Sequence, residues 1–210
     1  MSADAVCLAA RRLVGLSWGE PSTRREYSRL LAPWDPEPVA VQMARDQSSC
    51  ALTVAAILLI AEVDGMVRGW RRRPVCDPLR EPRAGHTDGV AYLEQLARQR
   101  SAYRRTGRDR PALYPGVWWT VSSGRGDEHV GLVVALEGEI AVCVEGGQVD
   151  PLSPNQGARA CTRIALTRRQ PAHANGRWCL AGRPLLYTAN AGELPTVGEG
   201  MPWSLIEVAP

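Results

Sequence analysis

The chain has 210 residues, with a hydrophobic content of 45%, a charged content of 22% and a formal net charge of +3. This length is sufficient for a full hydrophobic core, and the composition is typical of a soluble globular protein. The small net charge argues against a nucleic-acid-binding protein or one held on an anionic membrane surface. We therefore expect one domain over residues 1–210, with no nucleic acid among its partners.

The N-terminus begins MSADAVCLAARRLVG, without the basic start, apolar core and cleavage site of a secretory signal peptide. The longest apolar run, Ala51–Ala61, is too short to span a membrane. We expect synthesis in the cytoplasm, and delivery to the periplasm or cell wall only by a route other than general secretion. The six cysteines lack the C-x-x-C spacing of zinc sites, so reduced thiols and no metal site are expected.

Helical signals fill the first half of the chain. Capping residues, apolar periodicity and glycine or proline breaks predict where these helices begin and end. The cysteine-bearing helix is apolar throughout, and Gly65 and Gly69 are expected to close it. The predicted helices are Ser2–Gly15, Thr23–Leu31, Glu37–Arg45, Ala51–Val63 and Thr87 to about Tyr103.

Strand signals replace helical ones after Pro111. Short connections predict antiparallel pairing, and the whole pattern predicts an α+β fold with the helices packed on an antiparallel β-meander sheet. Residues 1–36 would form a helical extension, residues 37–150 a catalytic core, and residues 151–210 strands that complete the sheet. The predicted strands are Val117–Val121, His129–Leu136, Glu139–Glu145, Ala160–Thr167, and a hairpin of Trp178–Leu180 and Pro184–Thr188 around Ala181-Gly182.

Cys50 stands where a polar loop meets the apolar helix. Ser48 and Ser49 are good N-cap residues, so Cys50 is expected in the first helical turn. Unpaired backbone N–H groups and the positive end of the helix dipole favour an anion there, and a thiolate is such an anion. Cys50 is therefore a candidate nucleophile, although a buried cysteine that packs as a small hydrophobe is the commoner case.

A nucleophilic cysteine needs a base, and the chain offers His86, His129 and His173. His129 begins an apolar strand directly after a charged, glycine-rich segment, which places it at the polar end of a rigid element. The other two histidines lie in segments predicted to be loops. His129 is therefore the candidate base, with an ordinary surface or capping histidine as the alternative.

The base also needs a polar group that orients its ring. Candidates are Glu145, at the end of the next strand, and then Gln148 and Asp150. A two-residue turn at Glu137-Gly138 would place Glu145 on the wrong face of the sheet. A three-residue loop with positive φ at Gly138 would place Glu145 opposite Gly131, diagonal to His129, and Gly131 would leave room for it. Glu145 is the favoured third member.

Three segments resemble the papain-like cysteine amidases and peptidases of the NlpC/P60 and CHAP families. They are SSCALTV at Ser48–Val54, YPGVWW at Tyr114–Trp119, and EHVGLVVALEGEIAVCVEGG at Glu128–Gly147. In those families a cysteine opens a helix, a strand begins His-Val-Gly, and the next strand ends in a polar third member. This chain departs from the pattern in having Ser49, not Asp or Asn, before the cysteine, and Val117 in place of the aspartate of a Pro-Gly-Asp turn.

The resemblance implies a papain-like fold and a bacterial thiol hydrolase that cleaves amide bonds without metal or cofactor. By this likeness the substrate is most often a peptidoglycan peptide, and the enzyme would be of phage, toxin or housekeeping type, with an immunity protein as a candidate partner. The backbone N–H of Cys50 would stabilise the oxyanion. Further contacts to the oxyanion or the substrate are expected from Gln47, Ser49 and Trp118.

Two other functions use the same scaffold. The same triad would serve an enzyme acting on proteins, as a deamidase, protease or acyltransferase. A non-catalytic binding module would keep the fold and lose the reactive thiol. Cleavage products and the selective reactivity of Cys50 separate these alternatives.

Overall fold

The computed structural model describes residues 3–17, 20–31, 50–63, 88–99, 102–123, 128–149 and 163–194. Helices and one antiparallel sheet make up this part of the chain, which confirms the predicted α+β class. The helices are α1 (Ala3–Leu13), α2 (Pro21–Leu31), α4 (Cys50–Ile60) and α6 (Asp88–Gln99), with a 3-10 turn, η2 (Ala191–Glu193). The predicted helix Glu37–Arg45 lies outside the described residues.

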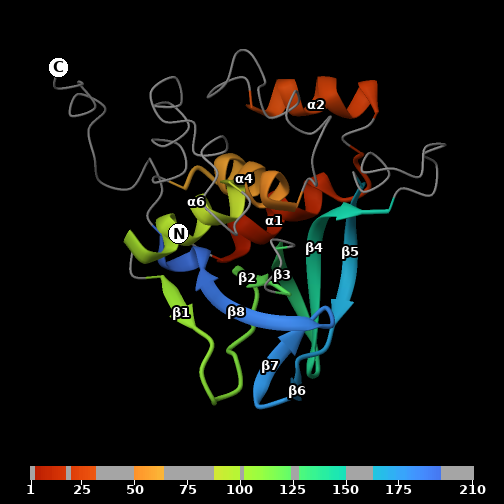
Figure 1. Ribbon diagram of the computed structural model, residues 1–210. Coiled ribbons are helices and arrows are strands. Elements are labelled where there is room, and N and C mark those ends of the chain that lie inside the picture. Colours follow the sequence, from red (N-terminus) through yellow and green to blue (C-terminus); the bar gives the residue numbers. More distant parts are fainter. Residues whose placement is uncertain are drawn as a thin grey trace, which may run out of the picture.

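Helix α4 is the centre of the helical layer. Ten of its residues, Cys50 through Leu59, are buried, because every side chain of this segment is apolar or, like Thr53, small. Helices α1 and α6 flank α4 over one side of the sheet, and α2 lies outside α4 (Figure 1). None of the described helices is long and apolar enough to cross a membrane.

The end of α4 differs from the predicted one. The helix ends at Ile60, before Gly65 and Gly69, and Glu62 takes the left-handed conformation with φ 57°. The backbone N–H of Val63 then donates to the carbonyl of Leu58 at 2.9 Å. This 6→1 bond is the capping pattern that usually uses glycine. A non-glycine residue therefore closes the helix here.

Over the residues that the structure describes, the sheet has eight strands, in the order β5-β4-β3-β2-β8-β7-β6, with β1 paired to β8. Every pair is antiparallel. The predicted meander holds from β2 to β5, but β8 returns to pair with β2. The strands are β1 (Tyr103–Arg105), β2 (Val117–Val121), β3 (His129–Glu137), β4 (Ile140–Gln148), β5 (Arg163–Arg169), β6 (Ala172–Ala174), β7 (Arg177–Leu180) and β8 (Arg183–Asn190).

Two tight turns shape the last hairpins. Ala181 and Gly182 have φ of 52° and 73°, as a type I′ turn requires, so the predicted hairpin between β7 and β8 is confirmed. Asn175 and Gly176, with φ of 50° and 73°, form the same kind of turn between β6 and β7. Strand β6 was not predicted, although Asn-Gly is the strongest short hairpin signal. It contains His173, which was expected in a loop.

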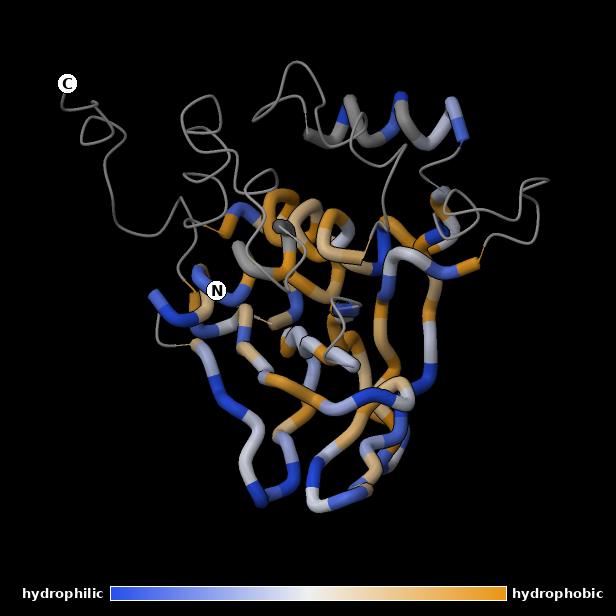
Figure 2. Tube along the Cα trace, in the orientation of Figure 1, coloured by the Kyte–Doolittle hydropathy of each residue, from blue (hydrophilic) through white to orange (hydrophobic). Residues whose placement is uncertain are grey.

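Both faces of the sheet bury apolar side chains. Alternate residues such as Trp118, Val130 and Leu132 pack against the helices in one cluster. The intervening residues, including Trp119, Val133 and Cys143, form a second cluster with Leu180 and Leu185. Apolar colour covers α4 and the strands beneath it, while polar colour marks the hairpin tips farthest from the helices (Figure 2). The strands around His129 and Glu145 are therefore held on both sides.

Candidate active site

His129 is the first residue of β3, at the end of the sheet. It pairs with Val121 of β2, and its side chain is 15% exposed. The ring of Trp119 meets the imidazole edge-on, with 5.7 Å between the ring centroids and an angle of 64°. The histidine is therefore a largely enclosed residue on a rigid element, not a loop side chain.

Glu145 reaches the same face as His129 through an irregularity in the sheet. Strands β3 and β4 are joined by a two-residue turn, since Glu137 pairs with Ile140, and Gly138 has φ 62°. The register then shifts by one residue between Val133 and Ala135, which is a β-bulge. The expected three-residue loop is therefore wrong, but the bulge restores the pairing that places Glu145 opposite Gly131.

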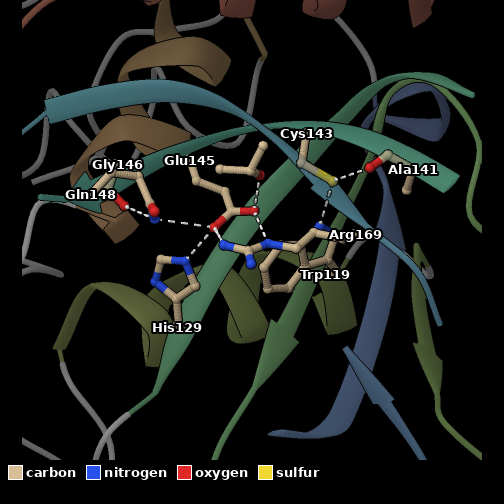
Figure 3. A network of polar contacts seen from close by, with 9 residues as sticks. Trp119, His129, Ala141, Cys143, Glu145, Gly146, Gln148 and Arg169 are labelled. Atoms are coloured by element: carbon tan, nitrogen blue, oxygen red, sulfur yellow. Dashed lines mark hydrogen bonds and ion pairs between the residues drawn. The ribbon is translucent and has the colours of Figure 1, made fainter. Parts of the chain in front are cut away.

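The carboxylate of Glu145 lies at the centre of a polar network, although its side chain has no exposed surface (Figure 3). Nε2 of His129 donates to Oε2 at 2.8 Å. The guanidinium of Arg169 donates from Nε and Nη2, each at 2.7 Å, one bond to each oxygen. Thr167 donates its hydroxyl, and Gln148 its amide at 3.2 Å. All the bonds favour the ionised carboxylate.

These contacts set the charge of Glu145. Burial alone raises its pKa, but the hydrogen bonds from Arg169 and His129, together with the charge of His129 and the Thr167 hydroxyl, lower the pKa to about 2. A carboxylate beside an arginine and several donors behaves this way even in a buried position. Glu145 therefore carries a full negative charge at neutral pH.

Cys50 completes the constellation from the helical layer. It is the first residue of α4, its exposed fraction is 3%, and a hydrogen bond links its side chain to His129. Burial lowers the pKa of His129, yet the bonds to Cys50 and Glu145 outweigh burial and raise the pKa to about 9. Because Nε2 faces Glu145, Nδ1 is the ring nitrogen left for the thiol.

This arrangement favours a thiolate–imidazolium pair at neutral pH. The imidazolium stabilises an adjacent thiolate, and Glu145 stabilises the imidazolium. Backbone N–H groups in the first turn of a helix are donors suited to a developing oxyanion, and Cys50 is the first described residue of α4. The site can therefore supply a nucleophile, a proton donor and an oxyanion donor at one place.

The other predicted site residues have different outcomes. Gln47, Ser49, His86 and Asp150 lie outside the described residues. Trp118 was expected to contact substrate, but it has no exposed surface and packs in the helix-facing core. Alternation along β2 explains this, because Trp118 and Trp119 point to opposite faces. It is Trp119 that faces His129.

Two residues of the network were not predicted. Thr167 and Arg169 lie on β5, where they pair with Cys143 and Ala141 of β4. Their two-residue spacing places them on the face that Glu145 shares, so alternation in the RIALTRR segment was the available signal. Gln148, an alternative third member, instead donates to Glu145.

Gly131 has no substitute in this site. A Cβ added there would lie 2.5 Å from Cζ2 of Trp119 and 2.7 Å from Cγ of Glu145. Both side chains are fully buried and cannot swing away. We predict that Gly131→Ala lowers the free energy of unfolding by about 1 to 3 kcal/mol and disturbs the contact between Glu145 and His129. Urea denaturation measures the first effect.

Gly107→Ala is the matched control, since a Cβ at Gly107 meets nothing within 4 Å. The urea concentration at the midpoint of its unfolding should equal that of the parent protein. A Gly131→Ala protein as stable as the parent would contradict the close packing described here.

Two further features of the described residues lie apart from this network. A cavity of about 320 Å³ opens at the Val117 end of β2 and is lined by Arg104, Arg105 and Thr188 among others, but by none of Cys50, His129 and Glu145. Within the described part of the chain, no group of three or more His, Cys, Asp or Glu side chains is placed to hold a metal ion.

Comparison with known proteins gives no match. No family model, no curated protein and no solved structure matches the chain. The candidate site therefore stands on its own residues: a cysteine at a helix start, a histidine at a strand start and a buried carboxylate between them and an arginine.

Proposed function

We propose that this protein is a cysteine hydrolase that cleaves amide bonds, with Cys50 as nucleophile, His129 as general acid and base, and Glu145 as the group that orients and charges His129. The observation that carries the proposal is one imidazole that bonds both the Cys50 side chain and the buried carboxylate of Glu145. The proposal includes a papain-like fold, in keeping with the resemblance to the NlpC/P60 and CHAP families.

The first half of the reaction forms a thioester. The Cys50 sulfur attacks the carbonyl carbon of the amide, and the oxygen takes up negative charge beside the backbone N–H groups that open α4. The C–N bond then breaks as the His129 imidazolium gives its proton to the leaving amine. Glu145 holds the ring throughout by accepting the bond from Nε2 at 2.8 Å.

The second half releases the acid. Neutral His129 accepts a proton from water, whose oxygen attacks the thioester carbon. The C–S bond breaks, and the proton remains on His129 beside the thiolate of Cys50. The products are a carboxylic acid and an amine, and the Cys50–His129 pair returns to its starting charge state. No cofactor is needed for this balance.

Peptidoglycan peptides are the substrate class that we propose first. The support is the resemblance of the SSCALTV, YPGVWW and EHVGLVVALEGEIAVCVEGG segments to cell-wall amidases and endopeptidases. An enzyme with this substrate would act in the periplasm or cell wall. An immunity protein would then be expected in a cell that makes it as a toxin.

Purified protein incubated with peptidoglycan is expected to release new amino groups and shortened muropeptides, detected by mass spectrometry. The rate should fall as the pH rises through about 9, because His129 then loses the proton that the leaving amine requires. A profile that keeps rising above this pH would contradict His129 as the proton donor.

Unmodified peptidoglycan would overturn the cell-wall substrate. The same incubation with a mixture of unfolded proteins tests the second class. New protein termini would indicate a protease. The mass increase that accompanies conversion of a side-chain amide to a carboxylic acid would indicate a deamidase. If neither substrate changes and Cys50 reacts with a thiol probe no faster than the other cysteines, the binding module replaces the hydrolase.

A further inference from the structure

We propose that Arg169 is a positioning residue of this site, which holds Glu145 ionised and oriented so that Glu145 can act on His129. This inference rests on the proposed function for its catalytic meaning, but the contacts that carry it do not depend on any substrate. With Arg169, the site would contain four charged side chains that contact one another in turn: Arg169, Glu145, His129 and Cys50.

The geometry of the Arg169 contact is that of a fork. Nε donates to Oε1 and Nη2 to Oε2 of Glu145, each at 2.7 Å, so each carboxylate oxygen is held by its own N–H group. His129 bonds Oε2 of the same carboxylate. Figure 3 shows Arg169 and His129 approaching Glu145 from different sides. The fork therefore fixes the rotation of the carboxylate that His129 meets.

The fork also compensates a buried charge. The Glu145 side chain has no exposed surface, whereas a quarter of the Arg169 side chain is exposed. Among the described residues, the titratable groups that act on Glu145 are His129 from β3, Cys143 from its own strand and Arg169 from β5, with Cys50 of α4 bonded to His129. Burial raises the pKa of Cys143 to about 12, so this thiol stays neutral. Arg169 is thus the permanent cation of the group.

Loss of Arg169 is expected to change the pKa of Glu145 in one direction. Burial then acts on Glu145 with fewer opposing hydrogen bonds, so the pKa of Glu145 rises from about 2. Once Glu145 binds a proton in mildly acidic solution, it no longer stabilises the imidazolium. The thiolate of Cys50 then loses its counter-charge. The reactive pair should consequently disappear at a higher pH than in the parent protein.

The test measures alkylation of Cys50 by iodoacetamide from about pH 4 to about pH 10, with mass spectrometry to identify the modified cysteine. In Arg169→Gln, the acidic limb of the rate profile is expected to move up by about 1 to 3 pH units. Arg169→Lys keeps the charge but not the fork, and should shift the limb by less. This variant also serves if Arg169→Gln does not fold.

Arg168→Gln is the matched control. Arg168 is the neighbouring residue of β5 and bonds the exposed carboxylate of Glu137, on the other face of the strand. Its profile should coincide with that of the parent. If Arg169→Gln folds but the acidic limb of its alkylation profile does not move, and the rate only changes uniformly with pH, the positioning role is overturned. Arg169 would then have a structural role alone.

The outcomes separate this inference from the proposed function. A shifted limb in a protein that cleaves no amide supports the role of Arg169 and refutes the hydrolase. Amide cleavage with an unshifted limb supports the hydrolase and refutes the role of Arg169.

Discussion

Cys50→Ala is expected to abolish amide hydrolysis, lowering the rate by at least about 10⁴-fold, as the loss of a covalent nucleophile does in comparable enzymes. The physical reason is that the alanine cannot form the thioester, and His129 then has no partner to activate. The substitution removes one sulfur at a helix start, so the fold should survive. Product release from peptidoglycan, followed by mass spectrometry, measures the effect, and circular dichroism checks the fold.

Other cysteines provide the controls. Cys179→Ala alters a partly exposed thiol on β7 and should leave the rate unchanged. Cys143 accepts a hydrogen bond from Nε1 of Trp119 at 3.3 Å, and its raised pKa predicts slow alkylation in the folded protein. Hydrolysis by Cys50→Ala at the parental rate would show that the nucleophile has been assigned to the wrong residue.

Glu145→Ala is expected to cost both activity and stability. It removes the acceptor for His129, Arg169 and Thr167 in one step and leaves the Arg169 guanidinium with a missing partner. Breaking a buried ion pair typically costs about 3 to 5 kcal/mol, and the partial exposure of Arg169 places the loss near the lower end. Urea denaturation at neutral pH measures this loss.

Two variants interpret that result. Glu145→Gln keeps the volume and removes the charge, so it should retain more stability than Glu145→Ala while still losing hydrolysis. Glu137→Ala breaks an exposed pair with Arg168 and should leave the midpoint of unfolding within experimental error. If Glu145→Ala unfolds at the same urea concentration as Glu137→Ala, the network contributes little to the fold.

Local signals were sufficient for the elements that carry the site. A run of apolar residues predicted the helix over Ala51–Val63, which the structure describes as Cys50–Ile60, and a second apolar run predicted the strand His129–Leu136, observed as His129–Glu137. Both signals depend only on the length and composition of a run of neighbouring residues. The room left by Gly131 was also predicted, and its Cβ position next to Glu145 confirms it.

The end of α4 and the strand β6 illustrate where local rules failed. Glu62 takes a left-handed conformation that the rules assign to glycine, and the helix ends before the glycines that were expected to close it. The Asn175-Gly176 turn carried a clear signal, yet the three-residue strand before it is too short and too exposed to show alternation. A strand signal of only three residues is outweighed by the loop-like composition around it.

The sequence by itself determined the α+β order of elements, the apolar helix that carries Cys50 and the strand start at His129, because each depends on contacts within a few residues. Only the tertiary structure decided that Glu145 faces His129 and that Trp118 does not line the site. A bulge at Val134, several residues from either partner, shifts the register and so selects the face. Arg169 entered the site for the same reason, since strand pairing joins residues that the chain keeps far apart.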